Sequence, residues 1–263
     1  MSALTSRDNP KVRHWAMLAK EARYRRTERR ALIEGPHLLA AALEHGYKPV
    51  AVLATEKAAA DVEIGGLIAR AGTRAVLLSE SLFNSISDVE TPQGIAAEIE
   101  IPDESGGDDV ASVFLEGVQD PSNVGAIVRS AAAFGIGRVL LDRECADAWS
   151  PKALRAGMGG HFAMRVYETG RLAALMDAFK GTLACAVPRG GVPLGEATLN
   201  SPIGWIFGAE GRGLSVETLR RVSVRVTIPM AQGTESLNVA AAAAICFYET
   251  QNRGLTPVSR SGA

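Results

Sequence analysis

Residues 205 to 253 constrain the fold more than any other stretch, because two short apolar runs there are each followed by a polar loop. The runs 205–207 and 224–228 predict strands. Pro229 ends the second run, since proline cannot donate a hydrogen bond to a strand ladder. We expect the two strands to be neighbours, with both loops at their carboxyl ends, where open α/β sheets bind ligands.

The two loops and the helix after them predict a ligand site. Glycines in the loop 208–213 permit positive φ angles and close approach of the backbone to a ligand. The loop 233–238 leads into an alanine-rich helix, with Ser236 as its expected N-cap and Gly254 as its stop. Helical spacing predicts an apolar face made of Leu237, Ala241, Ala244 and Tyr248. Each of these residues has a simple structural explanation when it is taken alone: the glycines turn the chain, Ser236 caps the helix and Glu210 is solvated. Their combination favours a ligand site.

The rest of the C-terminal half alternates strand and helix patterns. Strands are expected at 110–115, 138–141, 162–167 and 183–187, and helices from Val124, Pro151 and Arg171. Such alternation predicts an α/β fold with a largely parallel sheet and helices on both faces. We assign residues 110–255 to this domain, which contains the chemistry, and residues 256–263 to a tail.

The N-terminal half predicts a smaller α/β domain at residues 31–101, in which apolar runs alternate with helical segments. An acidic linker at 102–109 follows it. Residues 1–30 form a basic helical arm with nine Lys and Arg against three Asp and Glu. The cations around Tyr24 suit contact with RNA, and they equally suit an exposed helix end.

Composition excludes several classes of protein. The three cysteines and four histidines show no spacing typical of a metal site or a disulfide framework. We therefore expect no metal and a reducing compartment. The longest apolar run is too short to span a bilayer, and the charged N-terminus lacks a signal core. These features predict a cytoplasmic protein without a membrane partner.

A third polar loop begins the C-terminal domain and leads into a helix. Asn123 lies at the start of that helix, where asparagine is commonly only a cap. Arg129 lies about 200° around the helix from the apolar Ile127, at ~100° per residue, so it points away from the core. An outward arginine is commonly solvated, so neither residue alone indicates a function.

The three loops, in this order and spacing, resemble the motifs of the SpoU/TrmH branch of the SPOUT RNA methyltransferases. The matching segments are 120–125 with Arg129, 207–213, and 228–230 with 235–238. The region around 31–101 is similar to the substrate-binding domain of many members. The resemblance implies a ribose 2′-O-methyltransferase of tRNA or rRNA that uses S-adenosylmethionine. It also implies a deep trefoil knot and a homodimer with active sites at the subunit interface.

The resemblance also implies roles for individual residues. Backbone groups of the knot would bind the cofactor, at Gly208, Ile228, Met230 and Leu237. The catalytic set would comprise Arg129, Asn123, Glu210, Ser236 and Asn238. Many members have asparagine where this chain has Ala209, a departure that backbone recognition of the cofactor tolerates. Arg129 would stabilise the charge that develops on the ribose oxygen, because a guanidinium is not deprotonated in proteins.

Two alternatives compete with this interpretation. The first is a non-catalytic RNA-binding or ribosome-associated protein that retains the fold; the presence of every motif side chain argues against it. The second is a nucleotide-binding enzyme that uses residues 208–213 for phosphate. Both the P-loop and the Rossmann fingerprints are missing from the required positions, which argues against the second.

Overall fold

The computed structural model describes residues 3–103, 110–231 and 236–256. The chain divides into two compact units, and each is described by itself. The N-terminal unit comprises Met1–Pro102 with Trp149–Phe162, and the C-terminal unit comprises Asp103–Ala148 with Ala163–Ala263. Most of the expected linker 102–109 and tail 256–263 lies outside the described residues. Within the described ranges, no helix has both the length and the apolar character needed to cross a membrane.

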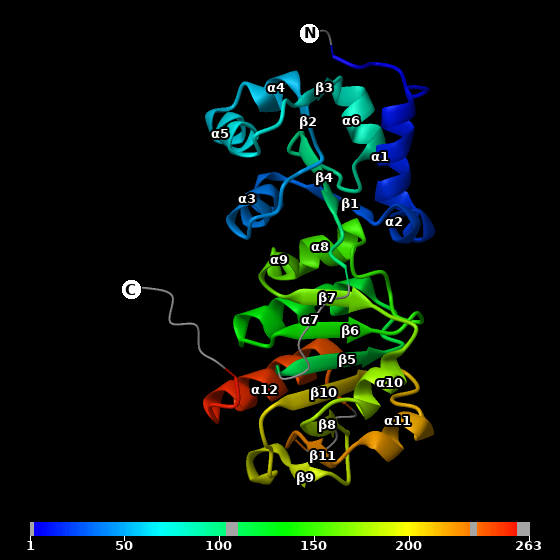
Figure 1. Ribbon diagram of the computed structural model, residues 1–263, viewed down its shortest axis with the longest axis vertical. Helices are drawn as coiled ribbons and strands as arrows, with labels where there is room; N and C mark the ends of the chain where they lie inside the picture. Colours follow the sequence, from blue (N-terminus) through cyan, green and yellow to red (C-terminus); the bar gives the residue numbers. More distant parts are fainter. Residues whose placement is uncertain (1–2, 104–109, 232–235, 257–263) are drawn as a thin grey trace. The chain divides into compact units, whose positions relative to one another are not determined.

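The N-terminal unit is built on a four-stranded sheet of order β1-β4-β2-β3 (Figure 1). Its strands are β1 (Arg30–Glu34), β2 (Ala51–Thr55), β3 (Val76–Leu78) and β4 (Ile95–Glu100). β4 runs antiparallel to both β1 and β2, whereas β2 and β3 are parallel. The apolar runs of this half therefore form strands, as predicted.

Helices of the N-terminal unit begin at the capping residues that the sequence provides. They are α3 (Pro36–Glu44), α4 (Glu56–Ala59), α5 (Val62–Arg70) and α6 (Glu80–Ile86). Thr55 accepts from the backbone N–H of Ala58 to cap α4, and Ser79 caps α6 in the same way. The residue after each of these two caps is a glutamate, a repeated arrangement at one end of the sheet.

The basic N-terminal segment forms two helices, α1 (Pro10–Lys20) and α2 (Ala22–Glu28), and it packs into the core of this unit. Trp15 is buried and donates from Nε1 to Glu98 Oε2 at 2.9 Å. Arg25 is only 3% exposed, and its Nη1 donates to the Leu18 carbonyl at 2.6 Å. Arg25 is therefore neither exposed nor placed to contact RNA, because its guanidinium caps the end of α1.

Two helices from the middle of the chain also belong to the N-terminal unit. They are α8 (Pro151–Gly157) and α9 (Gly160–Ala163). Arg155 Nη2 lies 2.9 Å from Asp88 Oδ2, and the rings of Tyr47 and Phe162 pack edge to face at 5.0 Å. The helix predicted from Pro151 is thus confirmed, and most of this segment packs with the N-terminal unit.

The C-terminal unit contains a sheet of order β7-β6-β5-β10-β8-β11-β9 within the described residues (Figure 1). Its strands are β5 (Ser112–Glu116), β6 (Arg138–Leu141), β7 (Arg165–Glu168), β8 (Thr182–Ala186), β9 (Val192–Pro193), β10 (Ile203–Gly208) and β11 (Val224–Thr227). Every neighbouring pair is parallel. The predicted fold class is confirmed, but the two strands expected to be neighbours, β10 and β11, are separated by β8.

Helices cover both faces of this sheet. One face packs against α7 (Pro121–Ala133) and α12 (Val239–Asn252), and the other against α10 (Leu172–Asp177) and α11 (Val216–Arg221). Successive residues of β10 alternate between the faces. Trp205 donates from Nε1 to Thr250 Oγ1 of α12 at 2.8 Å, whereas Ile206 packs in the cluster that contains Leu172 of α10.

The helix α12 differs from the prediction at its start and on its buried face. Asn238 is its N-cap and accepts from the N–H groups of Ala240 and Ala241, so the expectation of Ser236 as the cap is wrong. Both residue types are good caps, and the side-chain geometry decides between them. Phe247 is fully buried, whereas Tyr248 is 57% exposed. The predicted apolar stripe therefore lies largely outside the core, because alanines on every side leave the period ambiguous.

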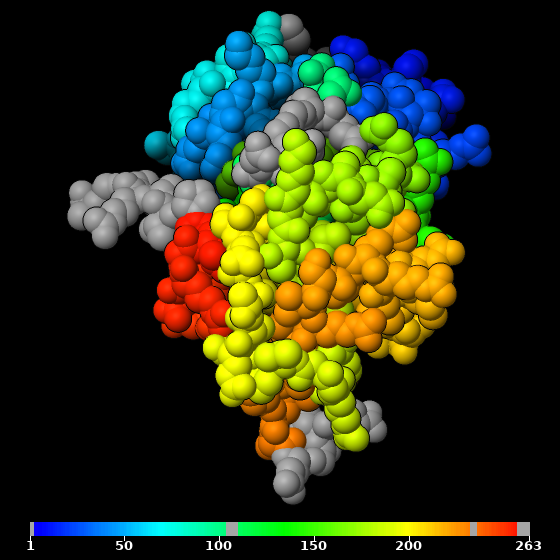
Figure 2. Space-filling view, turned by 60° about the horizontal axis from the view of Figure 1, so that its bottom comes forward, coloured from blue at the N-terminus to red at the C-terminus, as the bar shows by residue number. Residues whose placement is uncertain are grey.

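The C-terminal end of α12 is fixed to the segment that leads into β10. Arg253 donates from Nη1 to the Ala197 carbonyl at 2.5 Å and from Nη2 to the Leu194 carbonyl at 2.7 Å. Figure 2 shows this yellow segment alongside the red helix. The contacts hold α12 against the sheet at the end opposite Asn238. The expected trefoil knot stays a prediction.

Candidate active site

A cavity of about 680 Å³ lies at the carboxyl ends of β8, β10 and β11 and at the start of α12. Its size is typical of a cofactor pocket. It is lined by Ala186–Pro188, Phe207–Leu214, Leu219, Ile228, Met230, Ser236–Val239 and Ala242. The loop 208–213 and the described residues 236–238 therefore line one cavity, at the sheet edge where ligands of α/β proteins bind.

Seven of the nine predicted site residues line this cavity. They are the four expected cofactor contacts, Gly208, Ile228, Met230 and Leu237, with Glu210, Ser236 and Asn238 of the expected catalytic set. Asn123 is hydrogen-bonded to two of the lining residues, and Arg129 lies apart. The individual roles of these residues stay predictions.

The loop after β10 folds back on itself so closely that it requires a glycine. A Cβ atom on Gly208 would lie 2.5 Å from the carbonyl carbon of Gly213, which is far closer than side chains pack. Ala209 and Gly213 form an isolated antiparallel bridge, and Gly213 has a φ of 67°. The loop can therefore close in this way only with a glycine at position 208.

Asn123 connects the first loop to the other two. The N-cap of α7 is Asp120, whose side chain accepts from the Ser122 N–H, so the asparagine side chain is not needed for capping. Asn123 Nδ2 donates to Glu210 Oε1 at 2.6 Å. Asn238 Nδ2 in turn donates to Asn123 Oδ1 at 3.0 Å. Three predicted catalytic residues from distant parts of the chain thus form one hydrogen-bonded chain.

Arg129 does not join this group. It is exposed on α7 and is not among the residues that line the cavity. It makes no hydrogen bond or ion pair with any residue that the structure describes. Ile127 on the same helix is fully buried, which confirms the outward direction predicted for Arg129. Its guanidinium is therefore available to a partner or substrate from outside this chain's own cavity.

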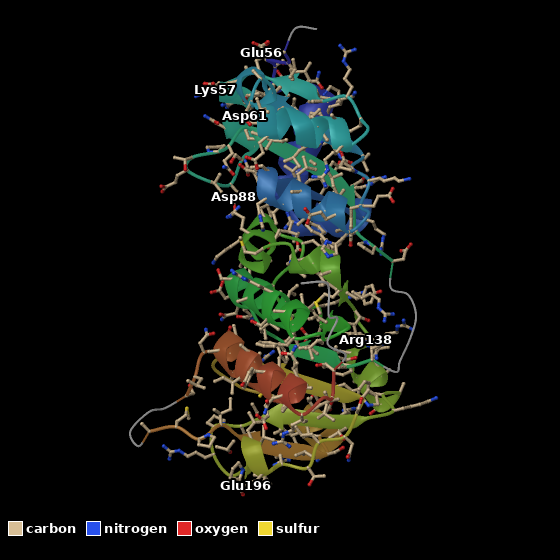
Figure 3. The ribbon with its side chains drawn as sticks, turned by 90° about the vertical axis from the view of Figure 1, so that its left-hand side faces the viewer. Glu56, Lys57, Asp61, Asp88, Arg138 and Glu196 are labelled. Atoms are coloured by element: carbon tan, nitrogen blue, oxygen red, sulfur yellow. The ribbon has the colours of Figure 1, made fainter. Side chains whose placement is uncertain are left out.

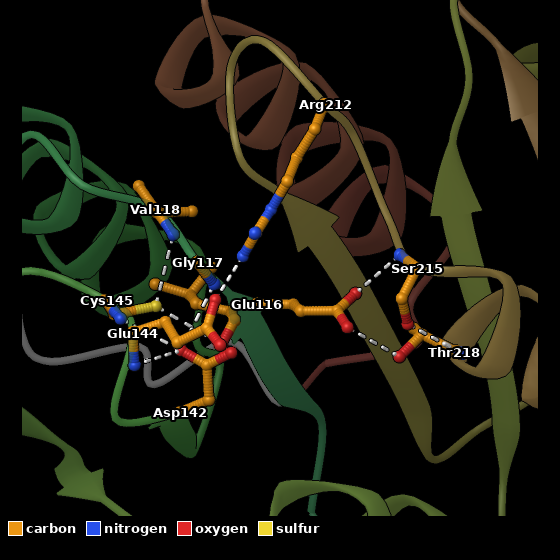
Figure 4. Close-up of polar contacts among 10 residues, drawn as sticks. Glu116, Gly117, Val118, Asp142, Glu144, Cys145, Arg212, Ser215 and Thr218 are labelled. Carbon is orange, nitrogen blue, oxygen red and sulfur yellow. Dashed lines mark hydrogen bonds and ion pairs between the residues drawn. The ribbon is translucent and has the colours of Figure 1, made fainter.

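Sequence reasoning missed Glu116, which anchors the loop after β10 (Figure 4). Glu116 Oε2 accepts from the Ser215 N–H at 3.0 Å, and its Oε1 accepts from Thr218 Oγ1 at 3.1 Å. Earlier in the same loop, Arg212 forms an ion pair with Glu144. The one available signal was a carboxylate at the end of the apolar strand β5, which is adjacent to β10.

The turn after β6 fixes the loop after β5 (Figure 4). Asp142 Oδ1 accepts from the N–H groups of Gly117 at 3.1 Å and Cys145 at 2.9 Å. Cys145 Sγ accepts from the Val118 N–H at 3.3 Å and donates to the Leu115 carbonyl at 3.4 Å. Burial raises the pKa of the Cys145 thiol, which therefore keeps its proton. A set of local contacts thus holds the first loop beside the second.

The fold and the cavity define a parallel α/β protein that binds an organic cofactor at the carboxyl edge of its sheet. Comparison with known families gives its identity. A model of the SpoU rRNA methylase family matches residues 111–248, more than half of the chain. A model of the MRM3-like substrate binding domain matches residues 9–97. The chain belongs to the SpoU rRNA methylase family, which confirms the resemblance of its three loops.

Relatives cover nearly the whole chain. A 23S rRNA (guanosine(2553)-2′-O)-methyltransferase RlmP of Bacillus subtilis is 32% identical, over 94% of this chain and 98% of its own length. The structure of a putative RNA methyltransferase of the TrmH family from Porphyromonas gingivalis is 31% identical, covers 94% of this chain and 98% of its own, and gives a TM-score of 0.81. An AdoMet-bound rRNA methyltransferase from Sinorhizobium meliloti is 26% identical, with coverages of 97% and 99% and a TM-score of 0.81.

The family uses S-adenosylmethionine, and the residues of the cavity fit this cofactor. The volume of about 680 Å³ lies in the range for ligands of this size. Gly208 lines the cavity without a side chain, which leaves backbone exposed at that point of the wall. Ile228 and Leu237 give the cavity an apolar lining, as is common in sites for organic cofactors.

Proposed function

We propose that this enzyme methylates a ribose 2′-hydroxyl of ribosomal RNA and that it acts as a homodimer. The hydrogen-bonded chain of Asn123, Glu210 and Asn238 beside the cavity carries the proposal, because it gathers side chains from all three loops. The name of the Bacillus subtilis relative, which covers almost the full chain, supports ribosomal RNA over tRNA. The non-catalytic alternative is not favoured.

The reaction requires a weak nucleophile to meet an activated methyl group. S-adenosylmethionine supplies that methyl group when it is bound. Glu210 and Asn238 line the cavity, and Asn123 holds them together, so these side chains would position the ribose. The guanidinium of Arg129 would stabilise negative charge on the ribose oxygen. Proton loss goes to water or to another acceptor, since an arginine cannot act as a base near neutral pH.

The position of Arg129 outside its own chain's cavity supports the proposed homodimer. Ile245 is 38% exposed and Tyr248 is 57% exposed on α12, and the Tyr248 ring packs at 6.1 Å from that of Phe134 at the end of α7. An exposed apolar surface beside an exposed arginine suits a two-fold interface. Arg129 of a second copy would then complete the site. A cytoplasmic location stays a prediction.

A mixing experiment tests the shared site. Arg129→Ala lacks the guanidinium, and Gly208→Ala lacks the closed cofactor loop. Heterodimers that contain one subunit of each type should regain methyl transfer at one of their two sites, because that site combines an intact cavity with the other subunit's arginine. Mixtures that stay as inactive as either variant alone, although subunit exchange is demonstrated, would place Arg129 in its own chain's site.

A nucleoside analysis tests the reaction itself. The enzyme is incubated with methyl-labelled S-adenosylmethionine and with a mixture of unmodified ribosomal RNA and unmodified tRNA. The two RNAs are then separated and digested to nucleosides. The proposal predicts label in a 2′-O-methylnucleoside. Label in a base would refute ribose methylation, and label in tRNA alone would refute the assignment of the substrate.

A further inference from the structure

A second cavity, of about 470 Å³, lies in the N-terminal unit and is not used by the proposed mechanism. It is formed where β2, α4, α5 and α6 meet the loop before β4. Its lining comprises Thr55, Lys57, Ala58, Asp61, Ile64, Glu80, Asn84 and Pro92–Gly94. We call this cavity the α4–α6 recess. Figure 3 shows Lys57 and Asp61 on the same side of the unit.

The inner wall of the recess is closely packed. Ala58 is 6% exposed and Ile64 is 7% exposed, so both present apolar surface that is otherwise buried. Gly94 has a φ of 74°, and a Cβ atom there would lie 2.6 Å from Thr55 Oγ1. Thr55 itself is fixed, since it caps α4. The wall is therefore a defined surface against which a flat ring can pack.

The rim of the recess has unused hydrogen-bonding capacity. Lys57, Glu80, Asn84 and Gln93 are exposed and make no hydrogen bond or ion pair with the part of the chain that the structure describes. Asp61 differs, because its Oδ1 accepts from the backbone N–H groups of Glu63 and Ile64. Four side chains thus offer an ammonium, a carboxylate and two amides to a ligand.

The charge of the recess selects the part of a nucleic acid that it can hold. Asp61 and Glu80 outnumber Lys57, so the lining repels a phosphate. A base edge fits better, and in RNA the unpaired bases are the ones that proteins read by such contacts. Guanine offers N7 and O6 as acceptors for an ammonium, and its N1–H and N2–H groups as donors for a carboxylate.

We propose that the α4–α6 recess binds one unpaired guanine of the RNA substrate. This inference rests on the proposed function, since it assigns to the recess the choice of target within the same RNA. Glu80 accepts from the N1–H and N2–H groups, Lys57 donates to the acceptor edge, and Asn84 and Gln93 complete the contacts. The methylated ribose and the guanine in the recess are separate contacts of one substrate.

The test compares two glutamates in matched positions. Glu80→Gln changes the recess, whereas Glu56→Gln changes the residue after the cap of α4, outside the lining (Figure 3). Binding of an unmodified 23S rRNA transcript is measured without methyl donor, over a range of salt concentrations. Glu80→Gln and Asn84→Ala should each weaken binding about tenfold, as expected for loss of a base contact. The salt dependence should be unchanged, because no phosphate contact is lost.

Inosine interference identifies the base. Transcripts that carry inosine at single random guanosine positions lack one N2 amino group each, and bound RNAs are separated from free RNAs. The wild type should reject inosine at one unpaired position, and Glu80→Gln should accept it there. Binding by Glu80→Gln equal to that of Glu56→Gln, or an identical interference pattern in both, would overturn the proposal.

The two proposals fail in different ways. Normal methylation of rRNA by the wild type, with an unchanged KM for RNA in Glu80→Gln, would refute the recess and leave the proposed function intact. Absence of methyl transfer, with RNA binding that still depends on Glu80, would refute the proposed function and leave the recess as a base-binding site.

Discussion

Asn123 donates a 2.6 Å hydrogen bond to the carboxylate of Glu210, although the two residues are 87 positions apart in the chain. The bond joins the start of α7 to the loop after β10. Because Asn238 donates to the same asparagine, one amide holds two cavity-lining residues in place. Asn123 thus joins two cavity-lining residues although it does not itself line the cavity.

Asn123→Ala should lower kcat for methyl transfer about tenfold or more, because it breaks both hydrogen bonds and leaves Glu210 unpaired. Glu210→Gln should lower kcat less than Asn123→Ala does. The loss of transition-state stabilisation in the double variant should be smaller than the sum of the losses in the two single variants. Steady-state kinetics measures this. Ser122→Ala, on the same turn of α7, is the control and should be nearly neutral. Additive effects of the two substitutions would show that the bond is not functional.

Gly208→Ala should weaken S-adenosylmethionine binding by about a hundredfold or abolish it, since a Cβ atom there meets the backbone of Gly213 and must open the loop. Gly211→Ala in the same loop has nothing within 4 Å of its added Cβ and should bind the cofactor almost normally. Isothermal titration calorimetry distinguishes the two. Equal affinity in both variants would mean that closure of the loop is irrelevant to the cofactor.

Glu116→Ala should raise the Kd for S-adenosylmethionine about tenfold, because it removes two hydrogen bonds that anchor the loop after β10. Thr218→Val removes one of them and should have an intermediate effect. Asp177→Ala is the control, because it breaks an exposed ion pair between the end of α10 and Arg221 of α11, the helix that also contains Thr218. If the control weakened binding as much as Glu116→Ala, a general loosening of α11 would explain the result.

The three cysteines should be unreactive in the folded protein. Burial raises the pKa of Cys185 to about 11, and it also raises the pKa values of Cys145 and Cys246. The thiolate is the reactive form, so modification by a disulfide reagent at pH 8 should be slow until urea unfolds the chain. Fast modification of any thiol in the native protein would contradict the burial of that residue.

The same shifts predict how stability depends on pH. The unfolded chain releases its thiol protons near pH 9, whereas folded Cys185 keeps its proton until about pH 11. Because the folded state binds protons more tightly, the free energy of unfolding should fall as the pH rises between these values. Urea titrations at pH 8 and pH 10.5 measure the change. A Cys185→Ser variant should lose part of this dependence, and an unchanged slope would contradict the assignment.

Much of the fold could be predicted from local patterns. The apolar runs mark most strands of both units, since a buried strand needs consecutive apolar residues. The order of the strands could not be predicted, because nothing in the run at β8 says that it enters between β10 and β11. The short elements β9 and α11 were also missed, since a strand of two residues and a helix of six residues are too short to show a clear period.

The candidate site also contains residues that the sequence predicted and residues that it did not. The predicted site residues were found because the order of the three motifs in the chain is distinctive, and seven of these nine residues line the cavity. Glu116 and Asp142 were not found, since their partners lie far away or form only in the folded turn. The buried face of α12 was misassigned because its many alanines fit several faces equally.

Comparison of Arg129→Ala with the wild type tests the central claim most directly. Transfer of labelled methyl from S-adenosylmethionine to unmodified rRNA is measured beside the Kd for the cofactor. Since Arg129 does not line the cavity, the account predicts an unchanged Kd and a loss of transfer of about 10²- to 10³-fold. A variant that transfers methyl groups at nearly the wild-type rate would remove Arg129 from the mechanism and contradict the account.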